Sequence, residues 1–221
     1  MNILITGTSS GLGRALADAF SDYNVYGINR TNDDKVNNIQ CNLANLKGIQ
    51  PALRELTVKK WDYVFLNAGI LGRLASTPEL DLEEYSRVFN INVLANKEIL
   101  DFLLERSVVK KVIGISSGAA LKAYYGWSLY CCSKAAFKQL IATYAEEYPK
   151  THFLSLAPGI IKTKMQDYIF EQNEIEIPSV SKFKKLYPDM ESPSVVAERI
   201  KKRLPLLDKK PSGSYFDLRE L

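Results

Sequence analysis

The features that direct a chain to a membrane, to a disulfide scaffold or to histidine chemistry are scarce in this sequence. Three cysteines, at positions 41, 131 and 132, have a spacing that fits neither a disulfide framework nor a metal site. His152 is the only histidine, which argues against histidine catalysis. No apolar run approaches the roughly 18 residues that cross a bilayer, and no signal segment precedes the first apolar run. These absences predict a cytoplasmic protein without a bound metal.

Excess charge of one sign is missing as well. The sequence has 29 Lys and Arg against 25 Asp and Glu, a net charge of +4 over 221 residues. Basic residues gather near positions 182–185 and 201–203 without interleaved stacking aromatics, which is typical of solvated helix faces. We therefore expect neither a nucleic acid nor a membrane as a partner.

What the chain does have is an alternation of short apolar runs and amphipathic stretches. Apolar runs predict strands at residues 3–5, 25–28, 39–41, 63–66, 112–115, 153–156 and 214–218. Helices are predicted at residues 12–20, 46–56, 82–106, 128–148 and 193–203. The alternation predicts an α/β fold over residues 1–221: a single-domain, Rossmann-like, doubly wound parallel sheet with helices on both faces. Residues 30–37 are too few for the helix that normally joins two parallel strands.

A glycine-rich turn follows the first predicted strand. Gly7 permits a tight turn, Gly11 lets backbone approach a pyrophosphate, and Gly13 lets the next helix pack closely on the strand. The amides at the start of that helix favour phosphate groups. An ordinary glycine-rich turn is the alternative, but the position between a strand and a helix favours dinucleotide binding.

The second strand ends in Asn29, Arg30 and Thr31, with no carboxylate before Asp33. An acidic residue here accepts hydrogen bonds from a free ribose 2′-hydroxyl, whereas arginine accommodates a 2′-phosphate. The residues present therefore favour NADP(H) over NAD(H), although a surface arginine at a strand end is the simpler interpretation.

Tyr130 and Lys134 are one turn apart on the same face of a predicted helix. A lysine ammonium at this distance is expected to lower the pKa of the tyrosine from about 10, which suits a proton donor near neutral pH. Asn92 falls on the apolar stripe of the helix predicted at 82–106, where a buried amide needs partners. The chain has other tyrosines, but among Tyr124, Tyr125, Tyr130, Tyr144 and Tyr148 the lysine four residues later belongs to Tyr130 alone.

Taken in order, these motifs resemble the short-chain dehydrogenase/reductase family over nearly the whole chain. The resemblance adds Asn67-Ala68-Gly69, Ser117 and the Pro158-Gly159 turn with Thr163. It implies that Tyr130, Lys134, Ser117 and Asn92 are catalytic, with Asn92 holding a water that links Lys134 to solvent. It also implies a set of cofactor-binding residues: Gly7, Ser9, Ser10, Gly11, Leu12, Gly13, Asn29, Arg30, Thr31, Asn42, Leu43, Asn67, Ala68, Gly69, Tyr130, Lys134, Pro158, Gly159, Ile161 and Thr163.

Within the family, the chain is similar to the sepiapterin reductase and benzil reductase branch. Gly126-Trp127 before Tyr130, and Met165-Gln166 after Thr163, resemble segments of that branch. The branch implies Asp217 as a substrate contact, and the family implies Ser117. The aromatic side chains of Tyr124 and Trp127 suggest an apolar substrate wall, and residues 163–191 are predicted to be a mobile lid. The chain departs from its relatives at two positions. Ser10 replaces a basic residue, which weakens the NADP(H) prediction, and Asn42 stands where many relatives have an aspartate that contacts adenine, although an amide oxygen can accept the same bond.

The resemblance implies an NADPH-dependent carbonyl reductase that transfers hydride to a ketone or diketone. A dehydrogenase that oxidises alcohols with NAD is the alternative within enzymology. A catalytically silent regulator that binds NADP(H) is the alternative of another class, although this chain keeps both tyrosine and lysine. The partner is a small carbonyl or alcohol substrate, and relatives suggest a homodimer or a homotetramer.

Overall fold

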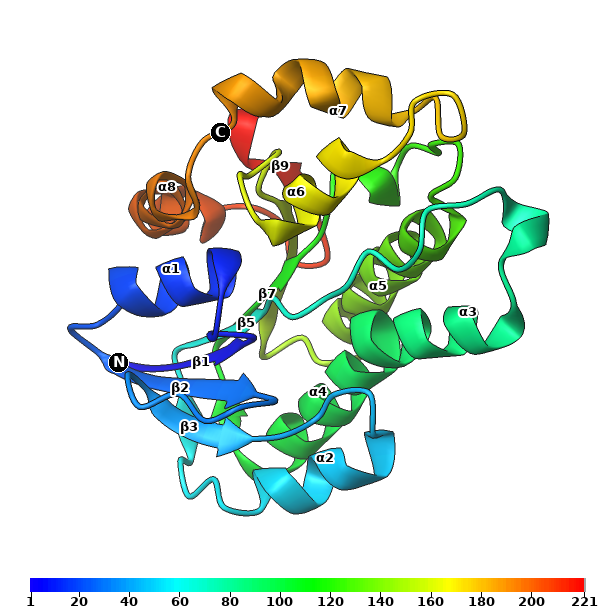
Figure 1. Cartoon of the computed structure of the whole chain (residues 1–221). Coiled ribbons are helices and arrows are strands. Elements are labelled where there is room, and N and C mark those ends of the chain that lie inside the picture. The colour runs from blue at the N-terminus through cyan, green and yellow to red at the C-terminus, as the bar shows by residue number, and fades with distance from the viewer. Residues whose placement is uncertain (221) are drawn as a thin grey trace.

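A seven-stranded parallel sheet forms the centre of the protein, in a computed structural model that describes residues 1–220 (Figure 1). The strand order is β3-β2-β1-β5-β7-β8-β9. The bounds are β1 (Asn2–Thr6), β2 (Asn24–Asn29), β3 (Asn37–Gln40), β5 (Tyr63–Leu66), β7 (Lys111–Ile115), β8 (His152–Ala157) and β9 (Tyr215–Asp217). Every pairing within this sheet is parallel, so the predicted fold class is confirmed.

Alternate residues of each strand enter two separate cores because side chains of a strand point to opposite faces. Leu4 packs with α2 (Leu46–Leu53), α4 (Ala95–Arg106) and α5 (Ser128–Glu147) on one face. Its neighbours Ile3 and Ile5 pack with α1 (Gly11–Ala19) and α8 (Pro193–Leu207) on the other. Burial on both faces explains why these strands are almost continuously apolar.

The connection from β2 to β3 contains no helix, as its length predicts. The two strands are nonetheless paired in parallel, with Ile28 beside Ile39. Val36 of the connection packs against the core that carries α1 and α8, in the place where a helix would otherwise contribute. Polar side chains complete the structure of this loop, and they are described with the site.

The helix predicted at 82–106 is confirmed in its bounds, but a π-helical segment interrupts its α-helical pattern. The structure has α3 (Leu82–Phe89), a π-helical segment (Asn90–Leu94) and then α4. Helix α8 runs past the predicted end and through Pro205. The remaining elements are two paired short strands, β4 (Lys60–Trp61) and β6 (Val108–Val109), and 3₁₀ turns at Thr77–Glu79, Gly118–Ala120, Tyr187–Asp189 and Leu218–Glu220.

Two helices occupy the segment predicted as a lid. They are α6 (Lys164–Glu171) and α7 (Val180–Leu186), which Figure 1 shows beyond the carboxyl ends of the strands. Ile169, Val180 and Phe183 of these helices are buried, so the segment has more packing than its sequence indicates. Whether it moves stays a prediction.

Across residues 1–220, no helix has the length and apolar character needed to cross a membrane. In the same range, no group of three or more His, Cys, Asp or Glu side chains is arranged to hold a metal ion. The three cysteines are free thiols.

Candidate active site

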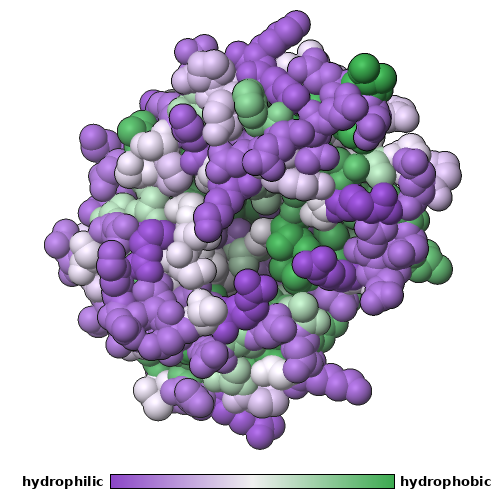
Figure 2. All heavy atoms as spheres, viewed as in Figure 1, coloured by the Kyte–Doolittle hydropathy of each residue, from purple (hydrophilic) through white to green (hydrophobic). Residues whose placement is uncertain are grey.

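A cavity of about 940 Å³ opens at the carboxyl ends of the parallel strands. Its walls come from the residues that follow β1, β2, β5, β7 and β8, with helix α6 on one side. Figure 2 shows a hollow near the middle of this face, with apolar atoms beside hydrophilic ones. Open α/β sheets bind their ligands at this edge.

Most of the predicted site residues line this cavity. The exceptions are Gly13, Asn92, Tyr124 and Asp217. The structure therefore brings Tyr130, Lys134 and Ser117 into one space with the residues predicted to hold a cofactor.

The glycine-rich turn has the backbone that its sequence predicts. Gly7 has a φ of +78°, a conformation that residues with a side chain rarely adopt. A Cβ added to Gly13 would lie 2.1 Å from the carbonyl oxygen of Gly7, so only glycine lets helix α1 approach the turn this closely. Gly13 thus shapes the turn without lining the cavity.

The start of helix α1 is available to an anion. Ser10 precedes the helix, and its side chain makes no capping hydrogen bond. The first amides of a helix have no partner within the helix, and they carry positive potential. A helix start of this kind, lining the cavity through Gly11 and Leu12, has the donors that a phosphate group needs.

Thr6, the last residue of β1, also shapes this part of the site, and the sequence prediction missed it. Its hydroxyl accepts hydrogen bonds from the amides of Asn67 (2.9 Å) and Ala68 (2.8 Å). The side chain of Asn67 in turn donates to the carbonyl oxygen of Thr6 at 3.0 Å. These bonds join the segment after β5 to the end of β1. The available signal was a threonine immediately before Gly7.

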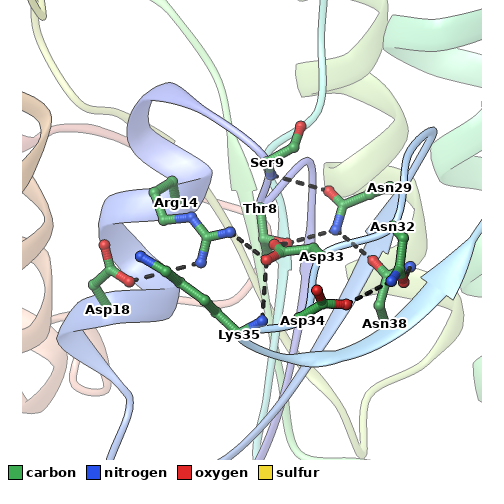
Figure 3. A network of polar contacts seen from close by, with 10 residues as sticks. All are labelled: Thr8, Ser9, Arg14, Asp18, Asn29, Asn32, Asp33, Asp34, Lys35 and Asn38. Atoms are coloured by element: carbon green, nitrogen blue, oxygen red, sulfur yellow. Dashed lines mark hydrogen bonds and ion pairs between the residues drawn. The ribbon is translucent and has the colours of Figure 1, made fainter.

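Beside this turn, a network of polar side chains holds the loop between β2 and β3 (Figure 3). The Asp33 carboxylate accepts hydrogen bonds from the Thr8 hydroxyl at 2.8 Å and from the Arg14 guanidinium. Asn29 donates to Thr8 at 2.6 Å and to Asn38 at 2.8 Å. The network connects the glycine-rich turn, helix α1 and the loop, so it replaces the missing helix as the support of this flank.

Asp33 is the first carboxylate after β2, and it bonds to Thr8 and Arg14. Burial alone would raise the pKa of Asp33, but the hydrogen bonds from Arg14 and Thr8 outweigh burial and keep that pKa below its ordinary value. Arg30 and Thr31 line the cavity, whereas Asp33 does not. A ligand in the cavity therefore meets the Arg30 guanidinium and the Thr31 hydroxyl of this loop. Sequence analysis did not identify Arg14, although it directly follows Gly13.

The residues predicted to be catalytic come from the segment after β7 and from α5. Ser117 follows β7, and Tyr130 and Lys134 lie on successive turns of α5. The Lys134 ammonium donates to the carbonyl oxygen of Ile115 at 2.8 Å, and its nitrogen lies 5.7 Å from the centroid of the Tyr130 ring. Only 4% of Lys134 is exposed, so this cation is almost entirely withdrawn from water.

The expected direction of the Tyr130 pKa is wrong for the protein alone. Burial raises the pKa of Tyr130 to about 12, and the nearby Ser117 hydroxyl opposes that shift only in part. Burial also lowers the pKa of Lys134 to about 8. Desolvation disfavours the charged form of both groups, which pattern spacing does not reveal. At neutral pH Tyr130 therefore carries its proton.

Asn92 lies in the π-helical segment rather than on a continuous helix. Its side-chain oxygen accepts from the Ile70 amide at 2.8 Å, and its amide group donates to the Ile70 carbonyl (2.8 Å) and to Ser133 (2.9 Å). Ser133 donates onward to the carbonyl oxygen of Tyr130 at 2.9 Å. Asn92 thus ties the segment after β5 to the catalytic helix, and π-helical turns are frequent at functional sites. Its role in a water relay stays a prediction.

Aromatic side chains form the wall next to Tyr130. Trp127 lines the cavity, and its indole ring stacks on Phe183 of α7 with centroids 4.8 Å apart. Tyr124 lies behind it, 5.4 Å from Trp127 and 5.5 Å from Phe183 between centroids. Tyr124 therefore supports the wall and does not line the cavity.

Asp217 forms an ion pair with Arg219. Arg219 donates to its carboxylate through Nε at 2.8 Å and through Nη2 at 2.5 Å. The hydrogen bonds from Arg219 lower the pKa of Asp217. Among the residues near the end of the chain, it is Tyr215 that contacts the catalytic segment, by donating to the Ser117 carbonyl at 3.2 Å. Asp217 does not line the cavity, so its predicted contact with the substrate is not seen in this structure.

Comparison with known proteins agrees with this geometry. Residues 1–174 match the family model described as short chain dehydrogenase. A benzil reductase ((S)-benzoin forming) of Bacillus subtilis is 30% identical over 241 aligned positions, which cover 98% of each chain. A sepiapterin reductase of Rattus norvegicus is 30% identical over 196 positions, which cover 74% of this chain and 75% of its own.

A solved structure of similar fold is a short chain dehydrogenase from Shigella flexneri complexed with NADP. It superposes with a TM-score of 0.76 at 20% identity, and it covers 99% of this chain and 96% of its own.

Proposed function

This chain belongs to the short-chain dehydrogenase family, and we propose that it is an NADPH-dependent carbonyl reductase that reduces a ketone or diketone with Tyr130 as proton donor. Its relatives are reductases and dehydrogenases of carbonyl and alcohol groups, so it is an oxidoreductase of this class. One observation supports the proposed reaction and cofactor: Ser117, Lys134 and a protonated Tyr130 line the same cavity as the start of helix α1.

The residues at the end of the cavity away from Tyr130 fit NADP(H). Members of the family use either NAD(H) or NADP(H). The uncapped start of α1 suits the pyrophosphate. Arg30 lines the cavity where the adenosine ribose would lie, and the nearby carboxylate of Asp33 is already bonded to Arg14. A guanidinium without a competing carboxylate suits a 2′-phosphate. The fold neighbour from Shigella flexneri, complexed with NADP, supports the same choice.

In the proposed reaction, NADPH supplies a hydride to the carbonyl carbon. Tyr130 donates its proton to the carbonyl oxygen as negative charge develops there. Ser117 lies in the same part of the cavity and donates a hydrogen bond to that oxygen. Lys134 holds positive charge close to Tyr130 and stabilises the tyrosinate that remains after proton transfer.

The choice of a diketone rests on the relatives. The benzil reductase of Bacillus subtilis matches this chain along its whole length, and its name states a diketone substrate. The apolar wall formed by Trp127 and Phe183 suits a substrate with aromatic or bulky groups.

The test is an assay of NADPH oxidation with benzil, quinones, aromatic aldehydes and sepiapterin, repeated with NADH. We expect turnover with at least one carbonyl compound and a higher kcat/KM with NADPH. A clear preference for NADH together with alcohol oxidation would show a dehydrogenase instead. NADPH binding without turnover of any carbonyl compound would show a binding protein.

A further inference from the structure

Tyr215 reaches from the last strand of the sheet to the segment that carries Ser117. Its hydroxyl donates a hydrogen bond to the Ser117 carbonyl oxygen at 3.2 Å, across 98 positions of the chain. The backbone of Tyr215 is fixed by β8, since Tyr215 pairs with Ser155 and the Ser155 amide donates to the Ser214 carbonyl at 2.9 Å. A strand at the edge of the sheet is therefore tied to the residue proposed to hold the substrate oxygen.

The Tyr215 hydroxyl keeps its proton near neutral pH. Burial raises the pKa of Tyr215 above its ordinary value, and the nearby Asp217 carboxylate acts in the same direction. A protonated phenol has a single O–H to donate, and the Ser117 carbonyl accepts it. The link between Tyr215 and Ser117 is therefore present at the pH where a carbonyl reductase is assayed.

Two further hydrogen bonds end at Ser117 and define the turn after it. The Ser117 hydroxyl accepts from the Ala119 amide at 3.1 Å, and the Ser117 carbonyl oxygen accepts from the Ala120 amide at 2.9 Å. The bond from Ala119 uses a lone pair of the hydroxyl, so the single hydroxyl proton is left for a substrate oxygen. The position of the Ser117 peptide thus decides where this donor lies.

Packing holds this turn on one side only. Ala119 is buried in the core that contains Tyr130. A Cβ added to Gly118, in contrast, would meet no atom within 4 Å, and residues 121–123 are exposed. Hydrogen bonds must therefore fix the rest of the turn, and the bond from Tyr215 is the one that comes from another part of the chain.

We propose that Tyr215 is a positioning residue, which holds the Ser117 peptide so that the Ser117 hydroxyl meets the substrate oxygen that Tyr130 protonates. This inference rests on the proposed carbonyl reduction. A donor to a developing oxyanion acts only from the correct place, and a misplacement of about 1 Å can lower a rate about 10²-fold. Tyr215 lies beyond residues 1–174, which match the family model, so the proposal extends the active site to the last strand.

A tyrosine that only stabilised β9 would differ from a positioning residue in one measurable way. If Tyr215 acts through Ser117, the loss of its hydroxyl matters only while the Ser117 hydroxyl is present. If Tyr215 acts on the fold in general, its loss has the same effect with and without that hydroxyl. A double-mutant cycle separates the two roles, because it measures the coupling between two residues.

The experiment measures kcat for benzil, or for the assayed carbonyl compound that is reduced fastest, in the wild type, Tyr215→Phe, Ser117→Ala and the double variant. We expect Tyr215→Phe to lower kcat about three- to tenfold, as for the loss of one hydrogen bond, and to change the Kd for NADPH about twofold or less. In the Ser117→Ala background, Tyr215→Phe should change kcat less than about twofold. Equal losses of kcat in both backgrounds would overturn the proposal.

Tyr144→Phe is the matched control. Tyr144 donates its hydroxyl to the Asp101 carboxylate and does not line the cavity. Its loss should change kcat about twofold or less in both backgrounds. Urea unfolding shows that each variant is folded before its kinetics are compared.

Amide hydrogen exchange, followed by NMR, gives a second readout that needs no turnover. In Tyr215→Phe we expect the Ala119 and Ala120 amides to exchange at least about threefold faster, relative to the amide of Leu4 in the central strand. In Tyr144→Phe this ratio should stay at its wild-type value. An unchanged ratio in Tyr215→Phe would overturn the proposal. If the wild type reduced no carbonyl compound, the proposed function would fail, and the exchange rates would still decide whether Tyr215 holds the turn at Ser117.

Discussion

The two ends of the cavity differ in how far their polar side chains bond to one another, although Arg14 Nη1 in the network beside Asp33 also lacks a hydrogen-bond partner among the described residues. At the adenosine end, Asp33, Thr8 and Arg14 bond to one another, and Asn29 extends the network toward Asn38. Near the proposed catalytic residues, Ser116 and Trp127 each keep a buried side-chain atom without a partner among the described residues. Among the described residues that line the cavity, the buried side-chain atoms without a hydrogen-bond partner are Ser116 Oγ, Trp127 Nε1 and Gln166 Oε1.

This difference follows from what each end must do. A loop without a helix needs internal bonds to keep one shape, and a network with paired donors and acceptors gives it that shape. The end with Tyr130 and Lys134 has no comparable network, since the Lys134 ammonium donates to the carbonyl oxygen of Ile115 and the two side chains are buried. Its burial also shifts the pKa values of Tyr130 and Lys134 in opposite directions, because water is excluded from both groups.

The largest difference between the two ends of the cavity should come from substitution of Tyr130, the proposed proton donor. We expect Tyr130→Phe to lower kcat for carbonyl reduction about 10²–10⁴-fold, because general acid catalysis contributes about that much. The adenosine end does not contact this hydroxyl, so the Kd for NADPH should change less than about threefold. Steady-state kinetics and a fluorescence titration with NADPH measure the two quantities.

The matched control is Tyr125→Phe, a change at an exposed tyrosine outside the cavity lining. It should leave kcat within about twofold of the wild type. Full activity of Tyr130→Phe would remove Tyr130 from the mechanism.

The lowered pKa of Lys134 predicts a pH limit that belongs to the catalytic end alone. Burial lowers the pKa of Lys134 to about 8, so its charge is present below that pH and is lost as the pH rises through it. We expect kcat/KM for reduction to fall about tenfold per pH unit above this point. In Lys134→Arg the charge persists, so the falling limb should move to higher pH. Identical pH profiles for the two proteins would contradict this role of the Lys134 charge.

The fold, and the motifs of the candidate site along the chain, could be predicted from the sequence because they depend on local patterns. Apolar runs located all seven strands of the main sheet, and the short connection after β2 indicated that a helix is missing. The residues after successive parallel strands meet at one edge, so the motifs there were expected to share a cavity. These inferences need no knowledge of which side chains touch.

The features that the sequence prediction missed depend on contacts between distant residues. Asn92, in the π-helical segment, bonds with Ile70 and Ser133, which lie far along the chain. The pairing of Asp33 with Arg14 crosses from a loop to a helix. Helices α6 and α7 are short, and part of their packing comes from Trp127. The raised pKa of Tyr130 depends on burial, which only the folded structure reveals.

Substitution of Arg30 tests whether the adenosine end selects the cofactor. We expect Arg30→Ala to raise the Kd for NADPH about 10–100-fold, since a charge-assisted bond to phosphate is lost. The Kd for NADH, which has no 2′-phosphate, should change about twofold or less. Titration with both cofactors measures the ratio. Lys35→Ala changes an exposed cation of the same loop that does not line the cavity, so it is the matched control. Equal losses for both cofactors would contradict a 2′-phosphate contact.

The smallest expected effect concerns the network itself. We expect Asp33→Asn to lower the free energy of unfolding by about 1–3 kcal/mol near neutral pH, because the Arg14 guanidinium loses its charged acceptor. Hydrogen bonds hold the pKa of Asp33 below its unfolded value of about 3.9, so the carboxylate stabilises the fold above that pH. Its contribution is lost as the pH falls through the lower, folded-state pKa.

Urea unfolding of wild type and Asp33→Asn, near neutral pH and again below about pH 3, measures this dependence. The difference between the two proteins should shrink at low pH, where the wild-type carboxyl is protonated and also neutral. Asp34 is an exposed neighbour that accepts a hydrogen bond only from Asn32 among the described residues, so Asp34→Asn should change stability by about 0.5 kcal/mol or less. A difference that stayed constant with pH would mean that Asp33 supports the loop by shape rather than by charge. The contrast between a paired adenosine end and an unpaired catalytic end would then no longer rest on electrostatics.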